Sequence, residues 1–199
     1  MESIGEKIFS FPTLYNAKVA FLKKINGLSA LSLNSLIENK EIIDIGCGSK
    51  SHFYTPEIVK KRTGIDCSPE MIASAKKLYP FATHYVASAE NLPFADKSFD
   101  IAIIQFVLHH IEPDHWHQVL TEAQRVAKES IIILDHVNHD KLLPSCIQKT
   151  WWNLTDGGKL YRKEKEWQQF LSTHPLQVIT YKRFGALFGN ICYYHLKIR

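Results

Sequence analysis

Residues 42–50 constrain the fold of this chain more than any other segment. They read Ile-Ile-Asp-Ile-Gly-Cys-Gly-Ser-Lys, an apolar strand that carries one acid and runs straight into a tight Gly-x-Gly turn. A second apolar run, residues 63–66, also ends in a carboxylate. A strand, a glycine turn, a helix and a second strand with a terminal acid are typical of a nucleoside-binding half of a doubly wound fold. In that arrangement Asp66 can bind both ribose hydroxyls.

The turn differs from a dinucleotide-binding fingerprint, which reads Gly-x-Gly-x-x-Gly. Its sixth position is Ser51 here, and an acid two residues before the first glycine is not part of that pattern. The turn resembles instead the first motif of the class I, Rossmann-like S-adenosylmethionine (SAM)-dependent methyltransferases. That motif, acid-x-Gly-x-Gly-x-Gly, is matched by Asp44, Gly46 and Gly48. Lys50 replaces the third glycine, which in the family lies near the methionine part of the cofactor.

Further segments support the resemblance because they follow in the family's order. Residues 64–76 resemble its second-strand segment, with Pro69 at a helix start, and residues 87–94, 98–105 and 108–111 follow. Together, residues 40–137 resemble the small-molecule branch related to quinone and sugar methylation enzymes. The resemblance implies an α/β fold: a seven-stranded, mostly parallel sheet with helices on both faces and a C-terminal antiparallel hairpin.

The length of 199 residues predicts one well-buried domain. We expect an N-terminal helical cap (1–38), a cofactor-binding core (40–137), a substrate-side helical region (138–175) and a C-terminal hairpin (176–199). Asp114 is expected to be an N-cap. Strands are predicted at 41–45, 62–66, 83–88, 99–105, 130–137, 176–184 and 190–198. Helices are predicted within 13–38, with a break at Gly27, and at 69–78, 114–128, 140–154 and 163–171.

Composition and charge narrow the class of protein. The net charge of +4 and the pI of about 8.8 are lower than those expected of a dedicated nucleic-acid-binding protein. The basic run 60–62 (Lys-Lys-Arg) is interpreted as a solvated face. The four cysteines lack zinc-finger or C-x-x-C spacing, which favours free thiols in a reducing compartment. With no signal peptide and no apolar run long enough to span a bilayer, the expected location is the cytoplasm.

The predicted cofactor site lies beyond the carboxyl ends of the parallel strands. By resemblance, Asp44 faces the amino group of SAM, the two turn glycines leave room for its carboxylate and ribose, and Asp66 binds the ribose hydroxyls. Ser88 stands where many relatives carry an aspartate, which would weaken the grip on adenine by about 1 kcal/mol. The full predicted set is Asp44, Gly46, Cys47, Gly48, Asp66, Cys67, Met71, Ser88, Ala89, Glu90, Gln105 and Phe106. Cys67 and Met71 are equally compatible with core packing.

Methyl transfer needs a general base only when the nucleophile must lose a proton. The candidates are His110, which we favour, His109, and Asp135 at the end of the fifth strand. The alternative is that one imidazole only supports its loop. The spacing of His115 and His117 does not place them on one helical face, so no metal site is expected.

The methyl acceptor is predicted to be a small molecule, methylated at oxygen, with nitrogen and carbon as the alternatives. We expect it to be bound by the aromatic residues Tyr15, Trp151, Trp152 and Tyr161. The two tryptophans are equally compatible with helix packing. Competing hypotheses are a catalytically inactive SAM-binding partner protein, a methyltransferase that modifies tRNA or protein, and, more remotely, a dehydrogenase. The acceptor, the methylated atom and the oligomeric state are not indicated by the sequence.

Overall fold

The structure is a computed structural model, and it describes most of the chain. The described residues are 12–25, 28–139, 145–146, 148–150, 152, 158, 160–186 and 189–199. Trp151 and much of the predicted helix 140–154 lie outside them, as does the side chain of Tyr15. No helix in this described part is long and apolar enough to cross a membrane.

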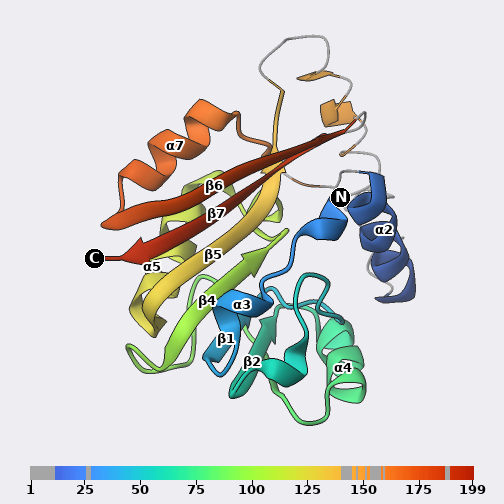
Figure 1. Ribbon diagram of the computed structural model, residues 1–199, viewed down its shortest axis with the longest axis vertical. Coiled ribbons are helices and arrows are strands. Elements are labelled where there is room, and N and C mark those ends of the chain that lie inside the picture. Colours follow the sequence, from blue (N-terminus) through green and yellow to red (C-terminus); the bar gives the residue numbers. More distant parts are fainter. Residues whose placement is uncertain are drawn as a thin grey trace.

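A seven-stranded sheet organises the molecule, in the order β3-β2-β1-β4-β5-β7-β6 (Figure 1). The first five strands are parallel, and β7 runs antiparallel between β5 and β6. The predicted fold class, including the C-terminal hairpin, is therefore confirmed. The strands are β1 (Glu41–Ile45), β2 (Lys61–Asp66), β3 (Thr83–Val86), β4 (Phe99–Gln105), β5 (Ala127–Val137), β6 (Leu176–Ala186) and β7 (Gly189–Ile198).

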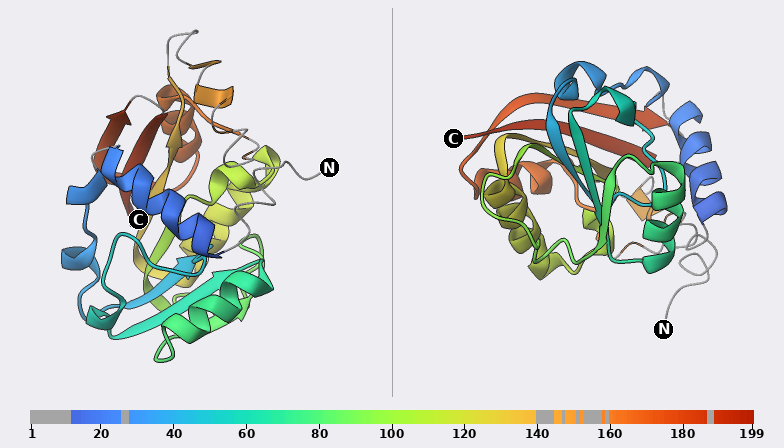
Figure 2. Two further views of the ribbon diagram at one scale, coloured as in Figure 1. Left: turned by 90° about the vertical axis from the view of Figure 1, so that its right-hand side faces the viewer. Right: turned by 90° about the horizontal axis from the view of Figure 1, so that it is seen from below.

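Helices cover both faces of the sheet (Figures 1 and 2). Trp116, Trp167 and their neighbours pack α5 and α7 on one face, whereas Leu28, Leu33 and Ile37 pack η1 and α3 on the other. Burial on both faces explains the apolar runs at the centres of β4 and β5, residues 101–104 and 131–134. The helices are α2 (Pro12–Ile25), α3 (Asn34–Ile37), α4 (Pro69–Leu78), α5 (Trp116–Val126) and α7 (Glu164–Ser172), and the 3-10 turns are η1 (Leu28–Ala30), η2 (Pro56–Ile58), η3 (Leu108–His110) and η4 (Pro113–His115).

Two local predictions were wrong. The predicted helix after Gly27 is split into η1 and the single turn α3, with residues 31–33 non-helical between them. Asp114 is not an N-cap, because Pro113 starts η4 and places Asp114 inside that turn. An N-cap residue needs an extended backbone, and the residue before α5 is instead His115, which makes no side-chain cap.

Candidate functional site

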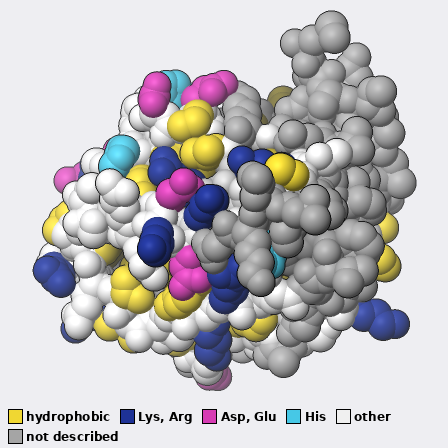
Figure 3. Space-filling view, turned by 90° about the horizontal axis from the view of Figure 1, so that it is seen from above, with side chains coloured by type: hydrophobic (Ala, Val, Ile, Leu, Met, Phe, Trp, Pro, Cys, Tyr) yellow, Lys and Arg dark blue, Asp and Glu magenta, His cyan; other side chains and the backbone are white. Residues whose placement is uncertain are grey.

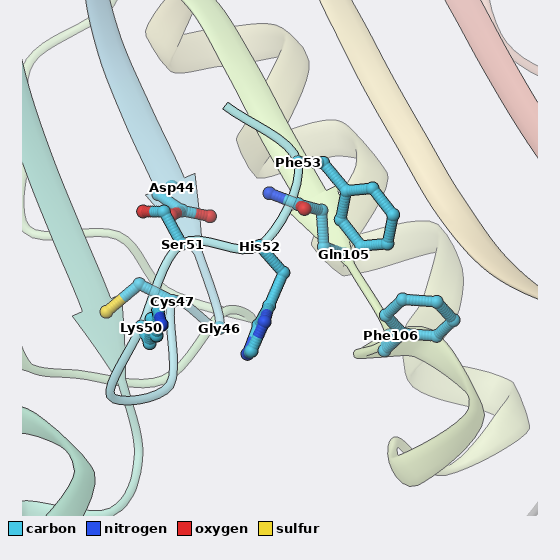
Figure 4. A pocket seen from close by; sticks show the side chains of 9 residues that line it. All are labelled: Asp44, Gly46, Cys47, Lys50, Ser51, His52, Phe53, Gln105 and Phe106. Carbon is cyan, nitrogen blue, oxygen red and sulfur yellow. The ribbon is translucent and has the colours of Figure 1, made fainter. Parts of the chain in front are cut away.

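A pocket opens at the carboxyl ends of β1 and β4, where the strand order reverses (Figure 4). This switch point is where open α/β sheets bind their ligands. The pocket has a volume of about 300 Å³, counting space open to solvent. Its lining residues are Asp44, Gly46, Cys47, Lys50, Ser51, His52, Phe53, Gln105 and Phe106. Five of them belong to the predicted cofactor set, and residues 50–53 were not in it.

The glycine loop between β1 and η2 needs its two predicted glycines. Gly46 and Gly48 adopt positive φ angles of 69° and 55°, which side-chain-bearing residues rarely adopt. A Cβ atom on Gly46 would also lie 2.2 Å from Cγ2 of Val107, on the segment that follows β4. The loop is therefore pressed against the chain leaving β4, which closes one wall of the pocket.

Asp44 is buried beneath this loop and uses only one of its oxygens within the protein. Its Oδ2 accepts hydrogen bonds from Tyr54 Oη at 2.5 Å and from Arg62 Nη2 at 3.0 Å. Its Oδ1 is buried without a hydrogen-bond partner among the described residues. Because a buried carboxylate oxygen without a partner is costly, this atom indicates a donor from a ligand, such as an ammonium group.

Arg62 is the cation that pairs with Asp44, and the interpretation of residues 60–62 as a solvated face was wrong for it. Lys60 and Lys61 are exposed, but Arg62 points inward from β2 with 2% of its surface accessible. Burial lowers the pKa of Arg62, but Tyr54 and Asp44 more than offset this and raise it overall. The sequence carried no local signal of this contact, because Arg62 follows two exposed lysines and its burial depends on the pairing of β2 with its neighbours.

His84 is the second partner of Arg62 in this buried cluster. Its Nε2 lies 2.7 Å from Arg62 Nη1. Burial and then the charge of Arg62 lower the pKa of His84 to about 4, so at neutral pH the ring is neutral and accepts this bond. The cluster therefore holds one matched pair of charges, Asp44 and Arg62.

Asp66 ties the glycine loop to the start of α4. Its Oδ2 accepts from the Gly48 N–H at 2.9 Å and its Oδ1 from the Ser68 N–H at 2.9 Å. Burial raises its pKa, against the lowering effect of these two N–H donors. Each carboxylate oxygen can accept a further hydrogen bond, so this geometry leaves capacity for the predicted ribose contact.

The predicted adenine-side residues are less closely grouped. Met71 is buried on α4, Cys67 is exposed, and the Ser88 hydroxyl accepts from the Glu90 N–H at 3.1 Å, which closes its own turn. Ala89 packs against the core as a partly buried side chain.

Helix α2 contacts the glycine loop through polar side chains. Asn16 Nδ2 donates to Ser49 Oγ at 3.0 Å, and Asn16 Oδ1 lies 3.1 Å from Nε2 of His52. Lys23 Nζ donates to the His52 carbonyl and sits 4.6 Å from the centre of the Phe53 ring. These contacts were missed because the sequence pattern of α2 shows amphipathicity and nothing about its partner.

Two of the three candidate bases meet at the ends of β4 and β5. His109 Nδ1 lies 2.5 Å from Asp135 Oδ1, and both residues are buried. Asp135 also accepts from the Leu108 N–H at 2.9 Å and the His136 N–H at 2.7 Å. Burial raises the pKa of Asp135, but His109 and His136 lower it overall, so the carboxylate is ionised at neutral pH.

An aromatic cluster continues from this pair toward the predicted acceptor region. His136 packs on Trp152 with ring centres 4.0 Å apart, and Trp152 lies 4.7 Å from Tyr161. Tyr161 stacks on His109 at 5.7 Å, and the ring of His110 lies 4.1 Å from that of His109. The structure thus brings two of the four predicted acceptor residues, Trp152 and Tyr161, beside the His109–Asp135 pair.

Comparisons with known proteins identify the domain. Residues 43–134 match the family model described as a methyltransferase domain. An uncharacterized methyltransferase of Synechocystis is 29% identical over 90 residues, covering 45% of this chain and 42% of the relative. The demethylmenaquinone methyltransferase of Thermotoga maritima is 30% identical over 131 residues, covering 59% and 53%. The chain therefore spans about half the length of these curated relatives.

Solved structures share the fold at low sequence identity. The YcgJ protein of Bacillus subtilis superimposes with a TM-score of 0.69 at 17% identity, covering 88% of this chain and 98% of that one. The magnesium protoporphyrin IX methyltransferase of Synechocystis, solved with bound S-adenosylhomocysteine (SAH), gives 0.64 at 17% identity, covering 94% and 83%. Residues 43–134 therefore match a methyltransferase domain, and the sheet order and the glycine loop are those of the class I, Rossmann-like fold of SAM-dependent methyltransferases.

Proposed function

We propose that this protein binds SAM and transfers its methyl group to an oxygen atom of a small-molecule acceptor. The observation that carries the proposal is the pocket at the strand-order switch point, where the buried Oδ1 of Asp44 has no partner among the described residues. The ammonium of the methionine end of SAM would supply that partner. Gly46 and Gly48 leave room beside it, and Asp66 would hold the ribose.

The residues of the pocket would position the two reactants. When bound, SAM supplies a methyl group on a positively charged sulfur; the carbon–sulfur bond breaks as the acceptor oxygen bonds to that carbon, and the electron pair stays on sulfur in SAH. Catalysis of such an in-line displacement is mostly orientation. Gln105 ends β4 and Phe106 follows it, and both line the pocket, where they would border the reacting centre.

The proton of an acceptor hydroxyl would pass to His109. The ionised Asp135 accepts the Nδ1 proton of His109, which fixes the tautomer with Nε2 as the basic nitrogen. This contact is why we now favour His109 over His110 as the base, with Asp135 as the residue that positions it. His110 stays the second candidate, since its ring packs against His109.

The aromatic cluster favours a planar or apolar acceptor. Trp152, Tyr161 and His136 lie beside the His109–Asp135 pair, and Phe106 links them to the pocket with its ring 5.3 Å from that of His136. One relative is named a demethylmenaquinone methyltransferase, and one structural neighbour is named a magnesium protoporphyrin IX methyltransferase. On the face shown in Figure 3, basic side chains are interspersed with acidic and hydrophobic ones, which gives no support to a nucleic-acid substrate.

We also propose a reducing compartment, the cytoplasm, as the location of the protein. Cys47, Cys67, Cys146 and Cys192 are all free thiols, of which Cys67 and Cys146 are exposed. Exposed thiols persist in reducing compartments.

Radiolabelled methyl transfer tests the proposal. The purified protein, with SAM labelled on its methyl group, would be offered quinols and other phenols, carboxylic acids, an acyl carrier protein thioester and tRNA. We expect label to reach a phenol or a carboxylic acid, and His109→Asn to abolish transfer to the phenol while SAM still binds. Transfer to tRNA alone would overturn the small-molecule assignment. SAM binding without transfer to any acceptor would favour the inactive partner protein.

A further inference from the structure

We propose that Lys50 binds the carboxylate of the cofactor's methionine end, so that the protein selects adenosyl sulfonium compounds that carry this carboxylate. The inference rests on the proposed function, because it adds a contact to the same cofactor. Lys50 occupies the position of the third glycine in the motif that the glycine loop resembles. In the structure Lys50 lines the pocket, where its ammonium can contact a ligand.

Lys50 lines the same pocket as Asp44. It is exposed, and no carboxylate of the described residues pairs with its ammonium. The neighbouring cation, Lys23, is already engaged by the His52 carbonyl and the face of the Phe53 ring. Of these two lysines, Lys50 is therefore the one whose ammonium is available to bind a ligand.

The charges around Lys50 favour an anion. Burial and then the charges of Lys50 and Lys23 lower the pKa of His52 to about 4, so His52 is neutral at pH 7. Burial and then Lys50 also lower the pKa of Lys23. The negative charge of Asp44 is matched by Arg62 at 3.0 Å. The wall thus carries positive charge that no acid of the described residues lining the pocket balances.

The amino-acid end of SAM fits this distribution. It carries an ammonium and a carboxylate on one carbon, and the pocket offers the unpaired Oδ1 of Asp44 for the first and Lys50 for the second. Figure 4 shows Lys50 and Cys47 at one end of the lining residues and Phe53 and Phe106 at the other. The proposed acceptor site adjoins Phe106, at the opposite end of the pocket from Lys50. An anionic acceptor would therefore not be the ligand of Lys50.

Isothermal titration with two probes tests the inference. The probes are SAM and decarboxylated SAM, which keeps the ammonium, sulfonium and adenosine but lacks the carboxylate. A charge-assisted hydrogen bond is typically worth about tenfold in affinity. We expect the wild type to bind SAM about tenfold more tightly than decarboxylated SAM. Lys50→Met should remove that preference by weakening SAM alone, and Lys50→Arg should keep part of it.

The control is Lys24→Met, which removes an exposed lysine of α2 that does not line the pocket. It should leave both affinities within about twofold, since surface charges at a distance are screened. Unchanged SAM affinity in Lys50→Met, or an equal loss for both probes, would overturn the inference and leave the proposed function standing. Failure of the folded wild type to bind either probe would overturn both.

Discussion

The candidate site has two sides, the pocket at the glycine loop and the aromatic cluster next to Phe106, and they are built by different kinds of contact. The glycine-loop side is held by charge and backbone geometry: Arg62 and Tyr54 fix Asp44, and Asp66 bridges the loop to α4. The other side is held by stacked rings around the polar pair His109–Asp135. This difference is what we expect if, as proposed, the first side binds SAM and the second binds the acceptor. Substitutions on the two sides should accordingly have separable effects.

The largest effect is expected for Arg62→Met. Removing this guanidinium leaves the buried Asp44 carboxylate without its cation, which typically costs about 3–5 kcal/mol of the free energy of unfolding. Urea denaturation of wild type and variant measures the loss. Lys61→Met, an exposed neighbour on the same strand, should change stability by no more than about 0.5 kcal/mol. A loss below about 1 kcal/mol for Arg62→Met would mean that Asp44 is not held as described.

Asp135→Asn should separate the two sides most clearly. An asparagine cannot supply the negative charge that orients His109, so kcat should fall about a hundredfold or more, while the dissociation constant of SAM stays within about twofold. Steady-state kinetics and titration with SAH measure the two quantities. An equal loss of SAM affinity would show that the two sides are coupled.

The same variant should change the pH dependence of stability. The pKa of Asp135 is lowered in the folded protein, because the contributions of His109 and His136 outweigh burial. The carboxylate therefore stabilises the fold above its unfolded pKa of about 4, and this contribution is lost as the pH falls through the folded pKa. Melting temperatures between pH 7 and pH 3 should fall less steeply in Asp135→Asn than in the wild type, and parallel curves would contradict the assignment.

Gly46→Ala should act on the glycine-loop side alone. The new Cβ atom meets Val107 at 2.2 Å in a backbone conformation with φ of 69°, a strain of about 1–3 kcal/mol. SAH affinity should fall with stability, because the loop must shift. The double variant with Val107→Ala should recover the loss of stability that is due to the clash. It should keep the loss that is due to the positive φ angle. No recovery in a double-mutant cycle would argue against the close approach of loop and β4.

Tyr161→Phe should have the smallest effect. It removes the hydrogen bond from the Gly158 N–H to Tyr161 Oη, 3.0 Å long, while keeping the ring stacked on His109. We expect a loss of about 1 kcal/mol in stability and an unchanged dissociation constant for SAH. Tyr161→Ala, which also removes the ring, should raise the KM for the acceptor. Identical acceptor KM values for the two variants would remove Tyr161 from the acceptor side.

On the glycine-loop side, the sequence predicted the positions of the strands and the turn, but it did not predict the contacts that stabilise them. Apolar runs and the Gly-x-Gly turn are local signals, so β1, β2 and the turn could be located before the structure was known. The contact of Asp44 with Arg62 joins two strands, and no local pattern reports that an arginine after two exposed lysines points inward. Whether the Arg62 side chain is buried depends on how the strands pair.

For the aromatic side, the sequence predicted which residues take part, but it did not predict which of them contact each other. His109, His110 and Asp135 were candidates because they end neighbouring strands, but which of two adjacent histidines faces Asp135 depends on the 3-10 turn η3. The turn places His109, and not the favoured His110, at 2.5 Å from Asp135. The position of Asp114 inside η4 has the same origin, since short 3-10 turns carry little sequence signal.

Titration of the folded protein with SAH, with NAD as the competing nucleoside ligand, tests the central claim most directly. We predict that SAH binds with one site per chain, that NAD does not bind, and that Asp66→Ala weakens SAH binding by at least about tenfold, because the variant loses the predicted ribose contact and the acceptor of the Gly48 N–H. Binding of NAD in place of SAH, or no binding of SAH at millimolar concentration, would contradict the assignment of this pocket to SAM.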